Sequence, residues 1–460
     1  MTKLKDHTDV DGIGTVASPG ESADGSSRTF PEFPEFTKGQ KTYTAAVAFI
    51  AWSLAVYDIV SFGNMLPAIQ DEFGWSTTTA SYVATLVSVG SLAVAFVVGP
   101  IVDFLGRRLA LFVTTAGAAL SSGLAGLAIG PISLVLYRSL SGFGQSEQAV
   151  NACYLNEVFH AKRRGFFMAL VQAGWPVGVM ISALMGLSFE GMIGWRGVFV
   201  IGSFPLVIIL ILRIWLKESP FFLKVQYVRK LRAAGDAAGA ETAAQHYGLD
   251  MKNDRKNTYA ALFTPALRKH TIAIGVVFFL KAVADSQLAN LATTVLVKGK
   301  GINLNTALWT VFAANILAFI AFMVFGWLGD RIGRRETGIA CQVLAAAPAA
   351  YLLFVADSVV AVMISYSLML FFTQGTAAVL YAYVGESYPT RVRGTGVAYV
   401  AITGPIGFIV GPLMYAMLQS AGFNPAQAAL SAVSACVLSA LVLLAAKRIP
   451  PGQDLIGAAH

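Results

Sequence analysis

One segment occurs twice in this chain, as Gly99-Pro-Ile-Val-Asp-Phe-Leu-Gly-Arg-Arg108 and as Gly326-Trp-Leu-Gly-Asp-Arg-Ile-Gly-Arg-Arg335. We call these two segments the cassettes. They start 227 positions apart (326 − 99), close to half of the 460 residues, and each ends one long apolar stretch and begins the next. A motif that recurs at this distance indicates two related halves.

Composition predicts that the chain lies in a lipid bilayer. Hydrophobic residues make up 56% and charged residues 13% of the chain, against roughly 45–50% and about 25% in soluble proteins. The formal net charge is +8, but most lysines and arginines stand between apolar stretches and form no single patch. That distribution is typical of membrane topology signals, so we expect no nucleic-acid partner. In a membrane protein, two related halves predict movement about a central site.

Cysteine and histidine usage argues against a disulfide framework and against a metal site. Cys153, Cys341 and Cys436 form no CxxC pair, and the five histidines are scattered along the chain. The sequence also lacks G-x-x-x-x-G-K-[ST], G-x-S-x-G and H-E-x-x-H motifs. We therefore expect neither an enzyme nor an ATP-driven pump, with no metal and no organic cofactor.

Twelve apolar stretches approach the length of about 20 residues that a spanning helix needs. They lie near 43–66, 78–101, 108–128, 131–156, 166–189, 197–217, 270–293, 305–328, 337–355, 358–385, 395–419 and 425–446. The predicted fold is an all-α membrane protein with twelve transmembrane helices in two pseudo-symmetric six-helix halves.

Polar segments predict how these helices are divided. The stretch 218–268 is polar and of mixed charge, so we predict a cytoplasmic linker there, between halves at 43–217 and 269–447. The first 40 residues are polar and lack the features of a cleaved signal peptide. We predict a disordered cytoplasmic tail at 1–42 and a second cytoplasmic tail at 448–460.

Basic residues in the connections predict the orientation. One side of the membrane would hold Lys38, Lys41, Arg107, Arg108, Lys162, Arg163, Arg164, the linker, Arg331, Arg334, Arg335, Arg391, Arg393, Lys447 and Arg448, and the other only Arg196, Lys298 and Lys300. By the positive-inside rule both termini are expected in the cytoplasm. We expect a multi-pass monomer in the plasma membrane, which is the inner membrane of a bacterium.

The repeat extends beyond the cassettes. At an offset of 229, the paired residues are Gln145 and Gln374, Tyr154 and Tyr383, Glu157 and Glu386, Arg164 and Arg393, Pro176 and Pro405, and Gly178 and Gly407. At an offset of 227, Asp58 of the first stretch matches Asp285 of the seventh.

These motifs resemble the major facilitator superfamily over residues 43–446. The superfamily's loop motif G-x-x-x-D-[RK]-x-G-R-[RK] is nearly complete at Gly326–Arg335, whereas in the first cassette Phe104 replaces its first basic residue. Its fourth-helix motif R-x-x-x-G-x-G occurs at Arg138, Gly142 and Gly144. The resemblance implies a transporter that works by alternating access, with helices 1, 4, 7 and 10 around a central cavity.

Further motifs are similar to the aromatic-acid and metabolite:proton symporter branches. Asn151 followed by Glu157 resembles the aromatic-acid symporters, although Tyr57-Asp58 has one carboxylate fewer than their first-helix D-G-[FY]-D. The seventh stretch lacks the Q-Q-x-x-G-x-N of sugar porters, which disfavours a sugar. The resemblance therefore implies an organic acid as the substrate.

Ionisable side chains inside a bilayer are expensive, so each is a functional candidate: Asp58, Arg138, Glu147, Lys281 and Asp285. With about 1.5 Å per residue, Asp58 and Arg138 fall at similar height in the outer half of the membrane. Arg138 is predicted either to hold a substrate carboxylate or to brace its own half. Lys281 and Asp285 are four residues apart on one helix face, and either pair with each other or act separately on substrate and proton.

A proton carrier needs a carboxylate that changes its charge when a cation approaches. Three carboxylates and two cations leave one acid without a permanent partner. We rank Asp58 first as the proton carrier, Asp285 second and Glu147 third.

Other polar residues of the spans are predicted either to contact the substrate or to hydrogen-bond between helices: Tyr57, Gln145, Gln172, Trp175, Gln287, Asn290, Gln374 and Tyr383. The cassettes and the next cytoplasmic loops are predicted to form gates: Asp103, Arg107, Arg108, Glu157, Arg164, Asp330, Arg331, Arg334, Arg335, Glu386, Arg391 and Arg393. We expect Glu157 to pair with Arg163 or Arg164, and Glu386 with Arg391 or Arg393.

The leading functional hypothesis is proton-coupled uptake of a small organic anion, such as an aromatic or short-chain carboxylate. The coupling ion would be a proton, because the spans contain carboxylates. Two alternatives stay open: a proton-coupled exporter of drugs or metabolites, and a non-transporting nutrient receptor of the same fold.

Overall fold

The computed structural model describes residues 30–159, 167, 170–249, 259–388 and 392–449. Within these ranges only the backbone is described at 99–100, 102–105, 156, 393–394 and 398. The chain divides into two units, Met1–Pro34 and Glu35–His460, and every helix named below belongs to the second unit.

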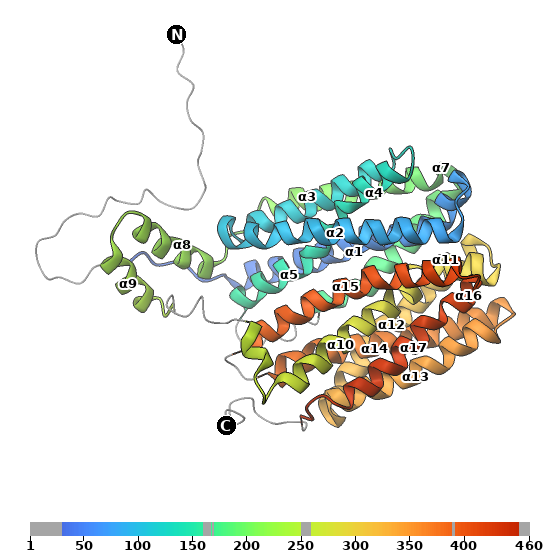
Figure 1. Ribbon diagram of the computed structural model, residues 1–460. Helices are drawn as coiled ribbons and strands as arrows, with labels where there is room; N and C mark the ends of the chain where they lie inside the picture. The colour runs from blue at the N-terminus through green and yellow to red at the C-terminus, as the bar shows by residue number, and fades with distance from the viewer. Residues whose placement is uncertain (1–29, 160–166, 168–169, 250–258, 389–391, 450–460) are drawn as a thin grey trace, which may run out of the picture. The chain divides into compact units, whose positions relative to one another are not determined.

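The described secondary structure is helical throughout (Figure 1). The first helices are α1 (Lys38–Phe73), α2 (Thr77–Leu105), α3 (Arg107–Ala125), α4 (Pro131–Ser139), α5 (Ser141–Val158) and α7 (Gly174–Arg213). They are followed, within 218–268, by α8 (Pro220–Ala233), α9 (Ala237–His246) and η1 (Tyr259–Phe263). The remaining elements are α10 (Arg268–Asp285), η2 (Ser286–Asn290), α11 (Ala292–Thr294), η3 (Val295–Gly299), α12 (Leu304–Ile332), α13 (Arg334–Phe354), α14 (Val359–Ser387), α15 (Arg393–Ser420), α16 (Pro425–Ala428) and α17 (Leu430–Leu443).

These helices account for the twelve predicted membrane spans. Ten helices of the described residues are long and apolar enough to cross a membrane. One of them, Leu170–Arg213, is two helices joined at Gly194, which has φ 66° and ψ 175°. The consecutive helices α4 and α5 occupy the predicted fourth span, whose charged side chains Arg138 and Glu147 lower its hydropathy. Each of the twelve predicted stretches therefore contains a described helix.

Polar residues fix where the spans begin. The side chains of Ser76, Asn303 and Ser358 accept hydrogen bonds from the backbone N–H three residues further on, at 3.1, 2.8 and 3.2 Å. These bonds satisfy donors that the first turn of a helix leaves unpaired.

Each cassette turns the chain at a glycine. Gly106, between α2 and α3, has φ 97°, and Gly333, between α12 and α13, has φ 115°. A side chain at such φ values is strained, so glycine allows the chain to leave one span and enter the next directly.

Glycines also let the helices of each half approach closely. A Cβ at Gly178 of α7 would lie 2.3 Å from the Ser53 carbonyl of α1, and one at Gly407 of α15 would lie 2.4 Å from the Phe279 carbonyl of α10. The two glycines are 229 positions apart, so the repeat places the same contact in both halves. Small residues at helix interfaces are typical of membrane bundles.

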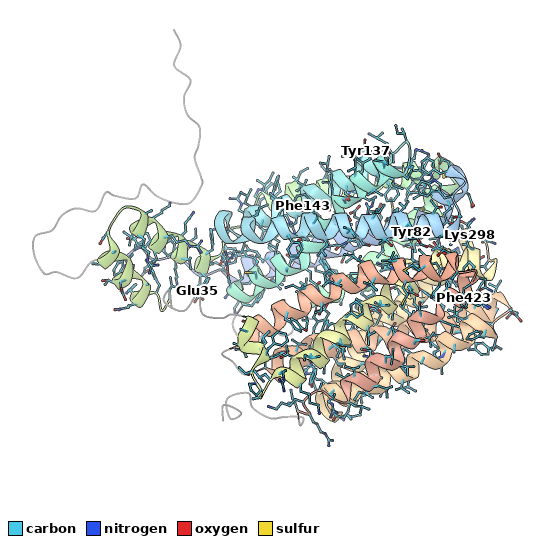
Figure 2. The ribbon with its side chains drawn as sticks, in the orientation of Figure 1. Glu35, Tyr82, Tyr137, Phe143, Lys298 and Phe423 are labelled. Atoms are coloured by element: carbon cyan, nitrogen blue, oxygen red, sulfur yellow. The ribbon has the colours of Figure 1, made fainter. Side chains whose placement is uncertain are left out.

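The two halves contact each other through several helices, including the second half of α1. α2 packs against α15 and α7 against α12, while the Thr293 hydroxyl donates to the Gly63 carbonyl at 2.6 Å. A Cβ at Gly63 would lie 1.9 Å from the Asn290 carbonyl, and Lys298 pairs with Asp71. Figure 2 shows Lys298 at the opposite end of the helices from Glu35, which precedes α1. We call this the closed end, and the other the cassette end.

A close glycine contact against the backbone of another helix gives a test of this packing. A Cβ at Gly142 of α5 would lie 2.0 Å from the Ser91 carbonyl of α2. We expect Gly142→Ala to destabilise the protein by about 1–3 kcal/mol, because backbone must move to accept the methyl group. Thermal unfolding of the purified protein measures the loss. Gly404→Ala is the control, since nothing lies within 4 Å of its added Cβ; equal melting temperatures of the two variants would contradict the predicted contact.

Candidate functional site

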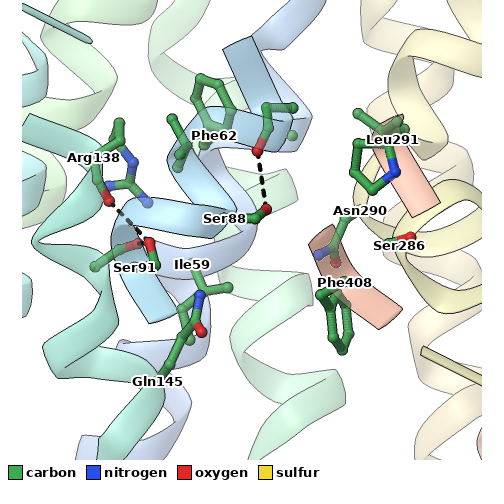
Figure 3. A pocket seen from close by; sticks show the side chains of 15 residues that line it. Ile59, Phe62, Ser88, Ser91, Arg138, Gln145, Ser286, Asn290, Leu291 and Phe408 are labelled. Carbon is green, nitrogen blue, oxygen red and sulfur yellow. Dashed lines mark hydrogen bonds between the residues drawn. The ribbon is translucent and has the colours of Figure 1, made fainter. Parts of the chain in front are cut away.

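A cavity of about 60 Å³ lies between the two halves. Side chains of α1, α2, α4 and α5 line one side of it and those of η2 and α15 the other (Figure 3). Its polar lining residues are Ser88, Ser91, Arg138, Ser141, Gln145, Ser286 and Asn290. Phe62 and Phe408 contribute aromatic rings from opposite halves. The cavity thus combines a cation, hydroxyl and amide groups, and apolar walls.

The cation of this cavity is bound to the predicted carboxylate. Arg138 Nη1 lies 2.6 Å from Asp58 Oδ1, and Nη2 donates to the Asp58 carbonyl at 2.6 Å. Nη1 also donates to the Ser121 hydroxyl at 3.1 Å. The rings of Phe62 and Phe199 lie 6.0 and 5.4 Å from the guanidinium carbon. The structure therefore brings together the two residues whose heights in the membrane were predicted to match.

Local packing positions Arg138. The chain breaks between α4 and α5 at Leu140, and Gly142 lets α5 lie against α2. There the Ser91 hydroxyl donates to the Arg138 carbonyl at 3.4 Å and shares a 3.0 Å hydrogen bond with Ser141. The R-x-x-x-G-x-G motif thus combines the cation with the glycine that brings its helix to the cavity.

The Asp58–Arg138 pair retains unused hydrogen-bonding capacity. Among the described residues, Asp58 Oδ2 and Arg138 Nε have no hydrogen-bond partner, and both side chains are at most 1% exposed. Unpaired buried polar atoms cost free energy. A proton on the Asp58 carboxylate, or a hydrogen-bond acceptor beside the Arg138 guanidinium, would therefore lower the free energy of this pair.

Glu147 has a partner that sequence reasoning missed, which is Arg213 of α7. Arg213 pairs with both oxygens of Glu147, and the two side chains are 1% exposed. Thr114 and Asn151 donate to the same carboxylate at 2.5 and 3.1 Å. The prediction that one of three acids lacks a permanent partner was therefore wrong, because it omitted this third cation. Arg213 lies inside an apolar stretch. The rule that every ionisable residue in such a stretch is a functional candidate would therefore have found it.

Lys281 and Asp285 form an ion pair along one face of α10. Of the two interpretations of this spacing, the structure has the self-paired one. The two side chains are 13% and 19% exposed, in contrast to the other two pairs.

The predicted polar contacts divide into cavity residues and structural residues. Gln145 and Asn290 line the cavity. The Tyr57 hydroxyl instead donates to the Val198 carbonyl at 3.4 Å, and the Tyr383 hydroxyl donates to the Lys447 carbonyl. Both tyrosines are 1% exposed, and of their two predicted roles the structure has the hydrogen bond between helices.

Four more of these residues lie outside the cavity lining. Gln287 donates to the Gly411 carbonyl at 3.0 Å and accepts from Ser431 at 2.7 Å, which makes it a bridge between helices. Gln172 accepts from Gln148 at 2.9 Å. The Trp175 ring lies 6.1 Å from that of Trp52, and Gln374 is 5% exposed.

The first cassette ties α3 to α5 and to the start of α8. Arg107 donates to Glu157 at 2.8 and 3.0 Å, and its guanidinium carbon lies 4.9 Å from the Phe222 ring centre. Arg108 donates to the Ile214 carbonyl at 2.7 Å. Ser219 donates to the second oxygen of Glu157.

The second cassette repeats this arrangement. Arg334 donates to Glu386 at 2.7 Å and pairs with Asp330 at 2.9 Å. Arg335 donates to the carbonyls of Leu443 and Leu444. The partner of each glutamate is thus an arginine of the cassette, within one half. Arg331 lies over the Trp327 ring at 4.2 Å.

Several predicted gate residues lie outside the described side chains. They are Asp103, Arg163, Arg164, Arg391 and Arg393. The described partners of Glu157 and Glu386 are Arg107 and Arg334, which were not the predicted ones. The gating role of the cassettes stays a prediction.

Glu218 caps α3, a role that sequence reasoning missed. Its oxygens accept from the backbone N–H of Arg107 and Arg108 at 3.1 Å each, where the helix N-terminus attracts negative charge. Burial raises the pKa of the Glu218 carboxyl, against the opposing effect of the N–H groups of Ser219, Arg108 and Arg107. Its position between α7 and α8, far in sequence from the cassette, gave no signal of this contact.

A cavity between two pseudo-symmetric helical halves, with paired charges in its wall and one end closed by contacts between the halves, defines a membrane transporter. Comparison of the sequence with known protein families identifies the family. The profile described as sugar (and other) transporter matches residues 43–449, and the chain belongs to this family within the major facilitator superfamily. Members of this family are transporters and not enzymes.

Known relatives include transporters of different substrates. The chain is 24% identical to a benzoate transport protein of Acinetobacter baylyi (79% of this chain, 80% of the relative). It is 25% identical to a gentisate transporter of Corynebacterium glutamicum (94% of each) and 24% to organic cation/carnitine transporter 7 of Arabidopsis thaliana (81% and 84%). The crystal structure of a D-xylose-proton symporter matches with a TM-score of 0.67 at 17% identity, covering 89% of this chain and 98% of that one. This likeness shows the fold.

The Glu147–Arg213 pair gives a stability prediction. Glu147→Gln leaves the buried Arg213 guanidinium without a counter-charge, and we expect a loss of about 3–5 kcal/mol in thermal or denaturant unfolding. The double variant Glu147→Gln/Arg213→Met removes both charges and should lie much closer to wild type. A single variant as stable as the wild type would contradict a buried pair.

Proposed function

We propose that this chain takes up a small organic anion, such as an aromatic or short-chain carboxylate, together with protons. The observation that carries the proposal is the Asp58–Arg138 pair in the wall of the cavity between the halves. A guanidinium holds a carboxylate through two parallel hydrogen bonds. A substrate carboxylate in the cavity can therefore replace Asp58 as the partner of Arg138.

When the substrate replaces Asp58 as the partner of Arg138, substrate binding becomes coupled to proton uptake. An Asp58 carboxylate that loses Arg138 stays in an apolar surrounding, where the charged form is unfavourable and a proton is taken up. Of the three candidate carriers, Asp58 is the one that contacts a cavity-lining cation, whereas Glu147 is held by Arg213 and two further donors. Asp285 has Lys281 as its partner, which keeps it the second candidate.

Relatives support the substrate class. Benzoate and gentisate, named for two of them, are aromatic carboxylates, and the similar solved structure is that of a D-xylose-proton symporter. The cation in the cavity favours an anion over the organic cation named for the Arabidopsis relative. The distribution of lysine and arginine supports a cytoplasmic location of the cassette end, and we propose a multi-pass monomer in a bacterial inner membrane.

Uptake into proteoliposomes tests the proposal. With acid outside, we expect benzoate and related carboxylates to accumulate above their external concentration, because inward proton flow drives them. The same vesicles without a pH gradient should only equilibrate. Carboxylate entry that ignores the gradient would contradict proton coupling, and acid-inside stimulation of exit without uptake would favour an exporter. No flux in either direction across a broad acid panel would favour a receptor.

A variant tests the role of Asp58. We expect Asp58→Asn to abolish gradient-driven accumulation, so that the internal concentration reaches only the external one, while counterflow exchange of labelled substrate continues. Asparagine keeps the size of the side chain but cannot carry the proton. Glu190→Gln, a carboxylate of α7 outside the cavity lining, is the control. Accumulation by Asp58→Asn at the wild-type level would transfer the role to Asp285.

A further inference from the structure

The Asp58 carboxyl is separated from the central cavity by the residues that line it. From α1 the lining takes Ile59, Phe62 and Gly63, and from α4 it takes Arg138. Among the residues that the structure describes, this lining includes neither Asp58 nor any residue of α3. Asp58 is 0% exposed, and Arg138 contacts both the carboxyl and the cavity.

α3 reaches the Asp58 carboxyl with two serines. Arg138 Nη1 donates to Asp58 Oδ1 at 2.6 Å and to the Ser121 hydroxyl of α3 at 3.1 Å. The next residue, Ser122, lies close enough to the Asp58 carboxyl to interact with it. One turn nearer the cassette end, apolar side chains of α1 and α3 share one buried cluster: Ala51, Leu54, Ala118 and Ala119. The two serines thus bring hydroxyl groups to surroundings that are otherwise mainly apolar.

Two neighbouring polar atoms at this place have no hydrogen-bond partner. Within the described part of the chain, both Asp58 Oδ2 and the Ser122 hydroxyl oxygen are buried and unpartnered, and Ser122 is 0% exposed. An ionised carboxylate only accepts hydrogen bonds, whereas a protonated one also donates, and a hydroxyl oxygen can accept. A proton on Oδ2 would therefore allow a hydrogen bond between these two groups.

We propose that the transported proton binds to Asp58 Oδ2 and is held there by a hydrogen bond to the Ser122 hydroxyl oxygen. The proposal rests on the proton coupling proposed above and names the place of the proton in it. Ser122 is a positioning residue, because it acts through Asp58 and not on the substrate. The substrate carboxylate reaches Arg138 from the cavity, and the proton lies on the side of α3. Arg138 thus links two ligands that need not touch each other.

The other groups around Asp58 are already engaged. The charged and titratable groups that act on its carboxyl are Arg138 of α4 and Tyr57 of α1. The Tyr57 hydroxyl donates to a backbone carbonyl of α7 at 3.4 Å. The Glu147–Arg213 pair contacts α3 seven positions before Ser122, about 10 Å nearer the cassette end. Ser122 is therefore the acceptor that the structure leaves for a proton on Oδ2.

The pH dependence of uptake tests this position. In the ionised pair Oδ2 lacks a partner although Ser122 is present, so Ser122→Ala should cost the ionised form little. The protonated form loses the acceptor of its O–H group. We expect half-maximal uptake of benzoate, or whichever carboxylate the wild type carries, to need about tenfold more protons, a shift of about one pH unit toward acid. Initial rates in proteoliposomes, with internal pH fixed and external pH varied, measure the shift.

A buried serine elsewhere in the same half provides the control. Ser81 of α2 is 1% exposed, lies outside the cavity lining and donates to the Thr77 carbonyl of its own helix at 2.8 Å. Ser81→Ala should keep the pH dependence of the wild type. Ser122→Ala should not lower the melting temperature, because the hydroxyl that it removes makes no hydrogen bond in this structure.

The Asp58→Asn background shows whether Ser122 acts through Asp58. Asparagine at position 58 binds no transported proton, so adding Ser122→Ala should leave the pH dependence of counterflow exchange unchanged. A shift in this double variant would overturn the proposal, because Ser122 would then act on another titratable group.

Two results with the single variant would also overturn it. An unchanged pH dependence in Ser122→Ala would remove the hydrogen bond to the proton. A shift toward higher pH would mean that the hydroxyl donates to the ionised carboxylate instead. In both cases uptake by the wild type is still driven by acid outside, so the proposed function survives. Wild-type uptake that ignores the pH gradient removes proton coupling itself, and with it this role of Ser122.

Discussion

The cost of placing a charge in an apolar medium is the constraint on which this structure depends. Asp58, Glu147 and Asp285 lie within the spans, and each is paired with a cation: Arg138, Arg213 and Lys281. The pairs differ in what else holds them. Glu147 also accepts from Thr114 and Asn151, whereas Asp58 keeps an unpaired oxygen beside the cavity. A carboxylate held at both oxygens suits a structural role, whereas one with an unpaired oxygen can exchange its partner more readily.

Internal repetition builds the scaffold around these charges. Arg107 with Glu157 and Arg334 with Glu386 are the same contact in two halves, as are Gly178 against α1 and Gly407 against α10. The charges that we propose for substrate and proton break the repetition. Asp58 and Asp285 correspond, but the first pairs across to another helix and the second with a lysine one turn away. The repeat thus accounts for the two similar halves, and the residues that break it form the candidate site.

The sequence alone was sufficient to predict the features that depend on the length of apolar stretches, on the repeat and on the free-energy cost of placing a charge in a membrane. Twelve spans and the doubled cassette follow from apolar length and repeat, and the meeting of Asp58 with Arg138 followed from matched depth. The sequence was insufficient to predict the direction in which a polar side chain points. Tyr57 and Tyr383 are polar residues in apolar stretches, as Gln145 is, yet their hydroxyls bond to backbone carbonyls of neighbouring helices. Arg213 and Glu218 act on residues about 66 and 110 positions away, and no local pattern reports such contacts.

The contacts at the closed end depend on the solution that surrounds them. Lys298 and Asp71 are 28% and 68% exposed, so this tie between the halves is screened by dissolved ions, over a Debye length of about 8–10 Å at physiological salt. Another polar contact at this end is the hydrogen bond from the Thr293 hydroxyl to the Gly63 carbonyl, in which water can replace the hydroxyl when the helices part. We therefore expect ionic strength to shift the balance between closed and open arrangements of this end, so that a salty habitat and a dilute one would hold the same protein in different proportions of its states.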